Sequence, residues 1–572
     1  MLNESSPLNH PRLIAAFAAA LALAASLAGV NAYIGGGGDN AGYIAEAQSF
    51  RATGELREIF LADAPLSTLR PPLFPILLSG VMALFGDGVL PLKVFLSLCT
   101  GLAALAGSAA ALVALRENRK DLPGISAGVV ALWFALSPAL HRYGHDVLSD
   151  VPFTLAALGA IACCGRFVSA GGVVNVIALL VFLLGATLLR TAGLIIGGAL
   201  LIYTATYIWR PIEAAQRKRG LIASSVLIAA LVSLALFTGS SGTGYAGHVA
   251  GEQSLFDRVR LAAQFYGILQ PVEILGYSGL APKEAVYSVG VFGSLIAAIG
   301  WLTLLRSGRR LIPIVWLVYQ GVLLFWPFLD ARFFLPTLPL FLCMAAEGAA
   351  AALRHAERSR PLFAITSFLL LLFPALGALG LVLQAYSPEV QGATAVEWIC
   401  AVIVSAALTA TLLRRYNSAE ASAALPLGAF KTFAATVLVL LVMRAVFEEI
   451  IPERTRGPAP ASAGYADLYD ASAWLKDNAA NSDVVVSSKA SLVWFWSEGL
   501  RGMPVPKGAT SQAEKIASAQ WAIIDAIPED RAAQRYLLPL VNSGNAWKLV
   551  WEQNGTAVFR RVRQVNPSAT AP

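Results

Sequence analysis

Long apolar segments alternate with short polar ones along most of the chain. A membrane-spanning helix needs about 20 predominantly apolar residues. Segments of roughly this kind predict thirteen spanning helices, at 13–33, 91–115, 123–140, 151–168, 172–189, 192–209, 221–239, 286–305, 311–327, 333–353, 361–384, 396–413 and 431–448.

From residue 451 onward the pattern becomes that of a soluble α/β domain. It predicts helices over 467–478 and 529–541, strands over 483–487 and 521–525, and a hairpin over 547–563 that turns at Asn554-Gly555, a dipeptide suited to tight hairpin turns. We therefore expect a transmembrane domain over 1–450 and a small soluble domain over 451–572.

The basic residues predict the orientation in the membrane. Short cytoplasmic loops carry an excess of Lys and Arg, and alternate short loops here contain clusters such as Arg217-Lys218-Arg219, Arg309-Arg310 and Arg414-Arg415. These clusters predict a multi-pass protein of the cytoplasmic (inner) membrane with its N-terminus inside and residues 451–572 outside, as a periplasmic or other extracytoplasmic domain. The long loops at 34–90 and 240–285 then lie outside as well.

An apolar stretch at 71–85 is too short to span. Were it to cross the membrane, every later basic cluster would face outward, so we expect a helix that lies at the outer interface. The run at 13–33 also admits a cleaved signal peptide, because small residues close it. Its length favours an uncleaved helix.

Composition agrees with a polytopic membrane protein. Of 572 residues, 57% are hydrophobic and 13% charged, which excludes a soluble protein with one large core. The net charge of +7 reflects mostly the orientation signal, so it does not indicate nucleic-acid binding. All five cysteines lie in apolar segments, and no disulfide framework is predicted.

Asp39 follows four glycines directly after the first apolar segment, in Gly38-Asp39-Asn40-Ala41-Gly42-Tyr43. A carboxylate beyond the hydrocarbon edge stays ionised and is a candidate base. The alternative is that Asp39 simply caps a helix beginning at Asn40. Tyr43 is a candidate substrate-binding residue on the same stretch.

A second polar group lies between two predicted spans. It contains His141, His145, Asp146 and Asp150. The spacing of the histidines puts both imidazoles on one helix face, so a metal site is conceivable, but no third ligand is apparent. Asp150 has a capping role as its alternative.

Arg190 and Arg332 run against the inward bias of basic charge, and Arg70 stands directly ahead of Pro71-Pro72. Guanidinium groups match phosphate oxygens bidentately, which makes them candidates for binding an anionic substrate. Alternatives are a solvated residue before the helix at 71–85 for Arg70, snorkelling to lipid headgroups for the other two, and neutralisation of Arg332 by Asp330.

Five features follow one another along the chain: the acidic first loop, Arg70-Pro71-Pro72-Leu73-Phe74-Pro75, Ser149-Asp150-Val151-Pro152-Phe153, Arg190 and Arg332-Phe333-Phe334-Leu335-Pro336. In this ordered combination the chain resembles the GT-C glycosyltransferase superfamily. More narrowly, the chain looks like the bacterial relatives of protein O-mannosyltransferases and of the aminoarabinose transferases that modify lipid A. The resemblance implies a GT-C fold and a hexosyl- or pentosyltransferase. It implies Asp39 as the base and Asp150 and Asp146 as cavity residues. Some relatives carry an Asp-Glu pair where Asn40 follows Asp39 here.

The implied reaction is inverting transfer of a sugar from a polyprenyl-phosphate donor to a lipid, glycan or protein acceptor at the outer membrane face. Because arginines can stabilise the leaving phosphate, we expect no cofactor and no required metal. The main alternative is a transporter or flippase of a lipid-linked glycan, although no paired internal repeats are apparent. A scaffold whose outer domain binds cell-wall components is a third reading.

Overall fold

The computed structural model describes residues 11–562 except 36, 69, 117–123, 210–212, 240–254, 270–282, 327, 357–358, 373–393, 417–424, 445, 447–449, 452–453, 455–456, 458, 461–462, 506–515, 517, 529–530 and 544–545. The chain divides into two compact units. Unit 1 consists of Met1–Val30, Leu96–His145 and Ser149–Arg454, and unit 2 of Asn31–Phe95, Asp146–Leu148 and Thr455–Pro572.

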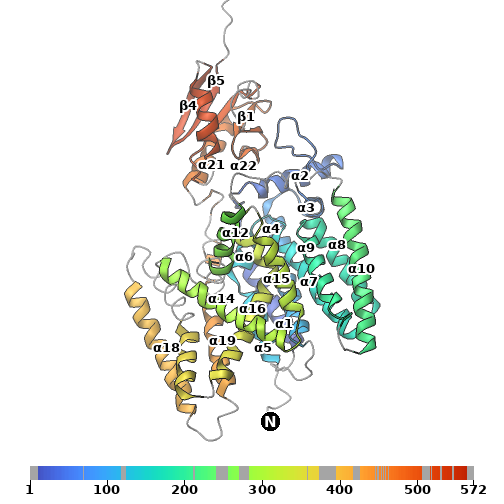
Figure 1. Ribbon diagram of the computed structural model, residues 1–572. Coiled ribbons are helices and arrows are strands. Elements are labelled where there is room, and N and C mark those ends of the chain that lie inside the picture. Colours follow the sequence, from blue (N-terminus) through green and yellow to red (C-terminus); the bar gives the residue numbers. More distant parts are fainter. Residues whose placement is uncertain are drawn as a thin grey trace, which may run out of the picture. The chain divides into compact units, whose positions relative to one another are not determined.

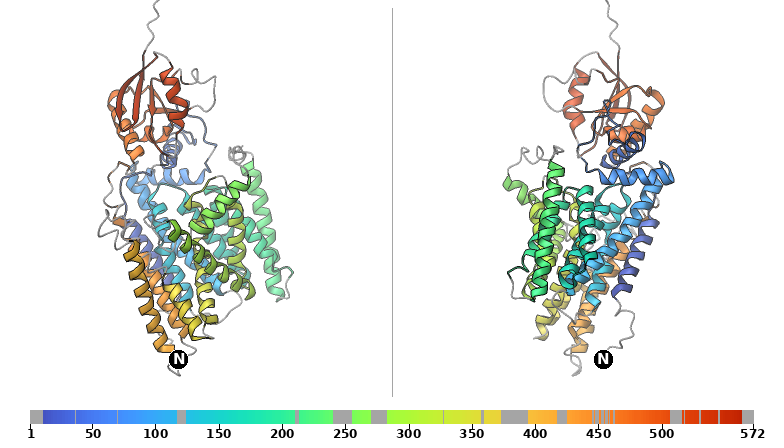
Figure 2. Two further views of the ribbon diagram at one scale, coloured as in Figure 1. Left: turned by 60° about the vertical axis from the view of Figure 1, so that its left-hand side comes forward. Right: turned by 90° about the vertical axis from the view of Figure 1, so that its right-hand side faces the viewer.

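Unit 1 is helical, and most of its longer helices run side by side (Figures 1 and 2). Its elements are α1 (Pro11–Ala28), most of α4 (Val89–Arg116), α5 (Gly124–Ala135), α6 (Pro138–His145), α7 (Asp150–Ala170), α8 (Val173–Leu189), α9 (Gly193–Ala205), α10 (Ala214–Gly239), α12 (Leu255–Gln264), η2 (Phe265–Leu269), α14 (Lys283–Arg306), α15 (Leu311–Leu323), the 3₁₀ helix η3 (Ala331–Thr337), α16 (Leu338–Ala356), the helix Arg360–Leu372, α18 (Thr394–Tyr416) and α19 (Leu425–Arg444).

Every predicted spanning segment contains a helix within the residues that the structure describes, although several helices end before the predicted segment does, such as α1 at Ala28 and α15 at Leu323. The segment at 123–140 is broken into α5 and α6, because Pro138 begins a new helix there. Within the described residues, four helices are long and apolar enough to cross a membrane, and nine more apolar helices are shorter. The chain is thus a multi-pass membrane protein, while the count of thirteen spans remains a prediction.

The backbones of α14 and α16 touch where they cross. A Cβ atom at Gly300 would overlap the carbonyl oxygen of Met344, and one at Gly348 would overlap that of Ile296. Helix interfaces in membranes use small residues for such close approach, since lipid provides no hydrophobic driving force for helix association.

Unit 2 contains a five-stranded sheet of order β2-β1-β3-β5-β4 (Figure 1). Strands β1 (Val484–Ser487), β2 (Arg501–Pro504) and β3 (Trp521–Ile524) are parallel, whereas β5 (Thr556–Arg561) is antiparallel to both β3 and β4 (Trp547–Gln553). Asn554 and Gly555 both have positive φ, so the predicted hairpin turn is confirmed.

The predicted helix over 467–478 appears as α21 (Ala463–Asn478). That predicted over 529–541 begins later, as η5 (Ala533–Leu537) and α24 (Leu538–Asn542). Helix α22 (Ala490–Trp496) and strand β2 were not predicted, because both are too short to show a clear period.

The first long loop folds as part of unit 2. It forms α2 (Asp39–Thr53) and α3 (Leu73–Phe85), which pack against each other. The helix expected over 71–85 is therefore present, and its place at the membrane interface stays a prediction. Most of the second long loop, predicted at 240–285, lies outside the described residues.

Candidate functional site

Asp39 opens helix α2. The residue before it, Gly38, has φ of +89°, a conformation that favours glycine, and no side chain caps the helix there. Asp39 is thus in the first turn, so the alternative that it caps a helix from Asn40 is wrong. Its side chain is 42% exposed, and the position of a carboxylate in a first turn is favoured by the helix dipole.

Arg70 binds three carboxylates of unit 2. Its Nη1 donates to Oε1 of Glu46 at 2.8 Å and lies 3.7 Å from Oε1 of Glu58, while Nη2 lies 3.5 Å from Oδ1 of Asp39. The hydroxyl of Ser67 also donates to Oε1 of Glu46, at 2.8 Å. Arg70 is therefore fixed by ion pairs and is not simply a solvated residue before the helix. These ion pairs link α2 to the segment that precedes α3.

The face of α2 that Arg70 crosses carries side chains that bind its guanidinium group. Asp39, Tyr43 and Glu46 recur at helical spacing, and the Arg70 guanidinium lies 5.3 Å from the centre of the Tyr43 ring. Between them, Gly42 leaves room: a Cβ there would come within 2.6 Å of Nη2 of Arg70.

Burial and charge set the protonation of this group. Burial raises the pKa of the Glu46 carboxyl, although the Arg70 guanidinium opposes that rise. Burial likewise raises the pKa of Glu58 against the same guanidinium. Desolvation disfavours the charge of Arg70, but Glu46 and Asp39 outweigh it and raise its pKa, so Arg70 stays a cation.

Asp146 also belongs to unit 2 and lies next to the glycine stretch. A Cβ at Gly35 would clash with Oδ1 of Asp146 and come within 2.7 Å of Nδ2 of Asn40. Gly35 thus makes the contact between Asp146 and the glycine stretch sterically feasible, and the role of Asp146 in a substrate cavity stays a prediction.

In unit 1, Asp150 and Arg190 form a buried ion pair through Oδ1 and Nη1. Asp150 is the first residue of α7, with Ser149 at the N-cap position and no side chain capping the helix, so capping is not its role. Oδ2 of Asp150 is buried and accepts no hydrogen bond from the described residues. Arg190 lies at the end of α8 in an extended conformation.

Arg190 and Arg332 share an aromatic ring. Their guanidinium carbons lie 5.1 Å and 5.2 Å from the centre of the Phe333 ring. Asp330 pairs with Arg332 at 3.1 Å and also accepts from the hydroxyl of Tyr143 at 3.0 Å. The expected ion pair between Asp330 and Arg332 is therefore present, and Arg190 pairs separately with Asp150.

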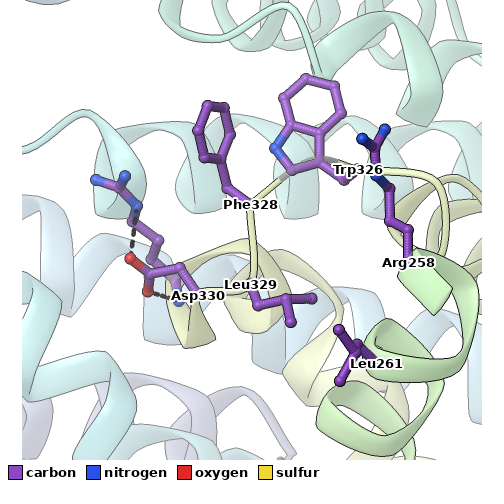
Figure 3. Close-up of a pocket in the computed structure, with 7 residues that line it drawn as sticks. Arg258, Leu261, Trp326, Phe328, Leu329 and Asp330 are labelled. Carbon is purple, nitrogen blue, oxygen red and sulfur yellow. Dashed lines mark hydrogen bonds and ion pairs between the residues drawn. The ribbon is translucent and has the colours of Figure 1, made fainter. Parts of the chain in front are cut away.

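Arg332 lines a cavity of about 440 Å³ in unit 1 (Figure 3). The figure shows the rings of Trp326 and Phe328 between Asp330 on one side and Arg258 of α12 on the other. Aromatic faces and guanidinium groups around one hollow suit a ligand that combines sugar rings with anionic groups.

The two histidines lie on α6, so the stretch expected to be a loop after residue 140 is helical as far as His145. Both are buried, and Nε2 of His141 contacts the carbonyl oxygen of Ala135 at 2.8 Å, as Nε2 of His145 does that of Ser26 at 3.0 Å. Within the described part of the chain, no group of three or more His, Cys, Asp or Glu side chains is placed to hold a metal ion. Substrate binding by the histidines remains a prediction.

Sequence reasoning missed Glu46, Gly42 and Phe333. Glu46 lies seven residues after Asp39, two helical turns along the same face, so the spacing of the acids held a usable signal. The stacking role of Phe333 depends on η3 packing against α7, which no local pattern indicates. Asp39 belongs to unit 2 and Arg190 and Arg332 to unit 1, so their convergence stays a prediction.

The described chain thus combines a bundle of apolar helices with a small α/β domain, and it carries acidic and basic side chains on the connecting segments. No protein-family model matches the chain, and no curated protein matches it.

The fold is similar to that of ArnT from Cupriavidus metallidurans in the apo state, with TM-score 0.56, 14% identity, and coverage of 96% of this chain and 97% of that one. It is similar to the same protein bound to undecaprenyl phosphate, with TM-score 0.53, 15% identity and coverage of 96% and 98%. The oligosaccharyltransferase AglB from Archaeoglobus fulgidus, in complex with an inhibitory peptide and a dolichol-phosphate, gives TM-score 0.51, 12% identity and coverage of 97% and 74%. The resemblance inferred from sequence is thereby confirmed for the fold.

Proposed function

We propose that this protein transfers a sugar from a polyprenyl-phosphate donor to an acceptor at the outer face of the cytoplasmic membrane. The pair of guanidinium groups on the Phe333 ring carries the proposal. Arg190 is fixed by a buried carboxylate and Arg332 opens on a cavity, so a phosphate there would meet preorganised donors. Solved structures of the same fold hold undecaprenyl phosphate or dolichol-phosphate.

The reaction follows from the groups at hand. An acceptor hydroxyl or amine forms a bond to the anomeric carbon while the bond from that carbon to the phosphate oxygen breaks, with inversion. Asp39 receives the acceptor proton, and the leaving phosphate keeps the electron pair, which Arg190 and Arg332 stabilise. Because the Asp39 side chain is 42% exposed, its carboxylate is accessible to an acceptor.

The remaining assignments complete the proposal. Asp150 is a second catalytic residue of the proposal, and Asp146, Arg70, Tyr43, His141 and His145 are its further substrate-binding residues. Thirteen spans place the N-terminus inside and the domain over 451–572 outside. A membrane-impermeant label that reached a cysteine at position 39 only from the cytosolic side would contradict this orientation.

The test of Asp39 uses the purified full chain in lipid nanodiscs, with the acceptor class taken from mass spectrometry of envelope lipids and glycans of a deletion strain. Asp39→Asn is expected to lower the transfer rate at least 100-fold, the lower range for loss of a general base. Asp87→Asn is the matched control, because Asp87 pairs with Arg51 on an exposed surface. Unchanged turnover in Asp39→Asn would sink the catalytic assignment.

The phosphate role is tested separately with Arg332→Ala. Loss of a charge-assisted contact of about 1.5–3 kcal/mol predicts roughly a tenfold or larger rise in the donor KM. Arg260→Ala is its control, since Arg260 is exposed on α12. A donor KM equal to that of the control would argue against phosphate binding at Arg332.

A further inference from the structure

The C-terminal part of the chain packs directly on the loop that carries Asp39, within unit 2. Ala45 of α2 and Phe60 share a buried hydrophobic cluster with Ala490 and Trp494 of α22, and Ile59, Leu61 and Phe495 pack against it. Segments more than 400 positions apart thus share one small core.

The same loop also adds to the edge of the sheet. Strand β2 lies at one edge of the sheet, and Leu61 forms a parallel bridge with its residue Gly502. The Gly502 amide donates to the Phe60 carbonyl at 2.7 Å, and the Ala62 amide donates to the Gly502 carbonyl at 3.0 Å. Pairing of this kind satisfies an otherwise open sheet edge.

Gly502 is suited to this place because a Cβ there would lie 2.6 Å from Cβ of Ala490. A larger residue would push α22 away from β2, and with it the cluster that holds α2.

A third contact reaches the residue before Asp39. The Ser491 hydroxyl of α22 donates to the Gly38 carbonyl at 2.9 Å and is buried. Gly38 holds the left-handed conformation from which α2 starts, so this bond fixes the direction in which the helix begins.

From these three contacts we infer that the C-terminal domain is a positioning element of the transferase: α22 and β2 hold α2 and its Asp39–Arg70 pair in one arrangement. Ser491, Gly502 and Phe60 act through α2 and do not touch the reacting atoms. The inference rests on the proposed function, because it gives the domain a catalytic purpose rather than that of a separate binding module.

The test compares Ser491→Ala and Phe60→Ala with the wild type and with Ser472→Ala, all as full chains in nanodiscs. Ser472 is the matched control, a buried serine of the same domain whose hydroxyl bonds its own helix, at Leu468. Ser491→Thr keeps a hydroxyl and should restore the behaviour of the wild type.

Two measurements are made: hydrogen exchange of the amides over 37–62, and the transfer rate. We expect both test variants to exchange at least tenfold faster there and to lose at least tenfold in kcat. Unchanged exchange in both variants would overturn the inference, as would faster exchange with a wild-type kcat. A wild-type chain that transfers no sugar to any acceptor would instead refute the proposed function, while the exchange data would still report whether the domain holds the loop.

Discussion

The guanidinium of Arg70 crosses helix α2 at Gly42, where a Cβ atom would come within 2.6 Å of Nη2. The absence of a side chain at one position thereby decides where a cation lies relative to Asp39 and Glu46. Gly42 is a helix-interior glycine whose cost of about 0.5–1 kcal/mol relative to Ala is offset by this contact.

Gly42→Ala is therefore expected to lower the transfer rate at least tenfold by displacing Arg70, and to lower the thermal midpoint as well, because the buried Glu46 loses its partner. Gly80→Ala provides the comparison, since Gly80 lies in α3 with open space around its Cβ position, and should be neutral or slightly stabilising. Equal transfer rates in Gly42→Ala and Gly80→Ala would mean that the position of Arg70 does not depend on the missing side chain at Gly42.

Removing Arg190 alone should lower stability more than replacing both members of the Asp150–Arg190 pair. Arg190→Ala leaves a buried carboxylate without its partner, and such losses cost about 3–5 kcal/mol, so the thermal midpoint should fall clearly. The double variant Asp150→Leu with Arg190→Met should recover much of this stability without recovering transfer. The midpoints are measured by the thermal unfolding of purified protein in detergent. Equal midpoints for wild type and Arg190→Ala would contradict a structural role of the pair.

Glu46 predicts a dependence of stability on pH. Its folded pKa is raised above the ordinary value of 4.5, so the folded state binds the proton more tightly than the unfolded state. The contribution of this group is fully present below pH 4.5 and is lost as the pH rises through the folded pKa. Glu46→Gln should remove it.

The measurement is thermal unfolding of wild type and Glu46→Gln across pH 4 to 8. The difference in midpoint, wild type minus variant, should fall as the pH rises above 4.5 and then level off. A difference that increased with pH would show that the Arg70 pairing dominates over burial.

The crossing of α14 and α16 predicts the most severe effect on folding. Gly300→Ala introduces a Cβ that overlaps a backbone oxygen, which no rotamer change relieves, so folded yield should drop strongly. Gly321→Ala in α15 is the control, with nothing near its Cβ position. Size-exclusion profiles of the expressed variants report the outcome, and a normal yield of Gly300→Ala would show that the two helices can separate.

The sequence pattern located most helices because spanning segments must satisfy their backbone hydrogen bonds internally. It did not predict that the segment at 123–140 breaks at Pro138, although that proline was visible. It also placed the sheet hairpin correctly, since Asn554-Gly555 specifies its own turn.

Candidate site residues were identifiable where charge is unusual for its surroundings: Asp39, Asp150, Arg190 and Arg332 are conspicuous in a chain with so few charged residues. Their partners were less visible. Glu46 lies within a helix of mixed polar and apolar residues, and Phe333 is one aromatic residue among many.

The amino-acid sequence alone determined that this is a multi-pass helical membrane protein with a small α/β part near its C-terminus, because hydrophobic length and turn residues act locally along the chain. Only the tertiary structure decided that Arg70 pairs with Glu46 as well as with Asp39, and that Arg190 and Arg332 both contact the Phe333 ring. It also decided that the C-terminal part of the chain packs on the first loop. Those relationships join residues up to 453 positions apart, and contacts over such separations depend on packing that no local pattern encodes.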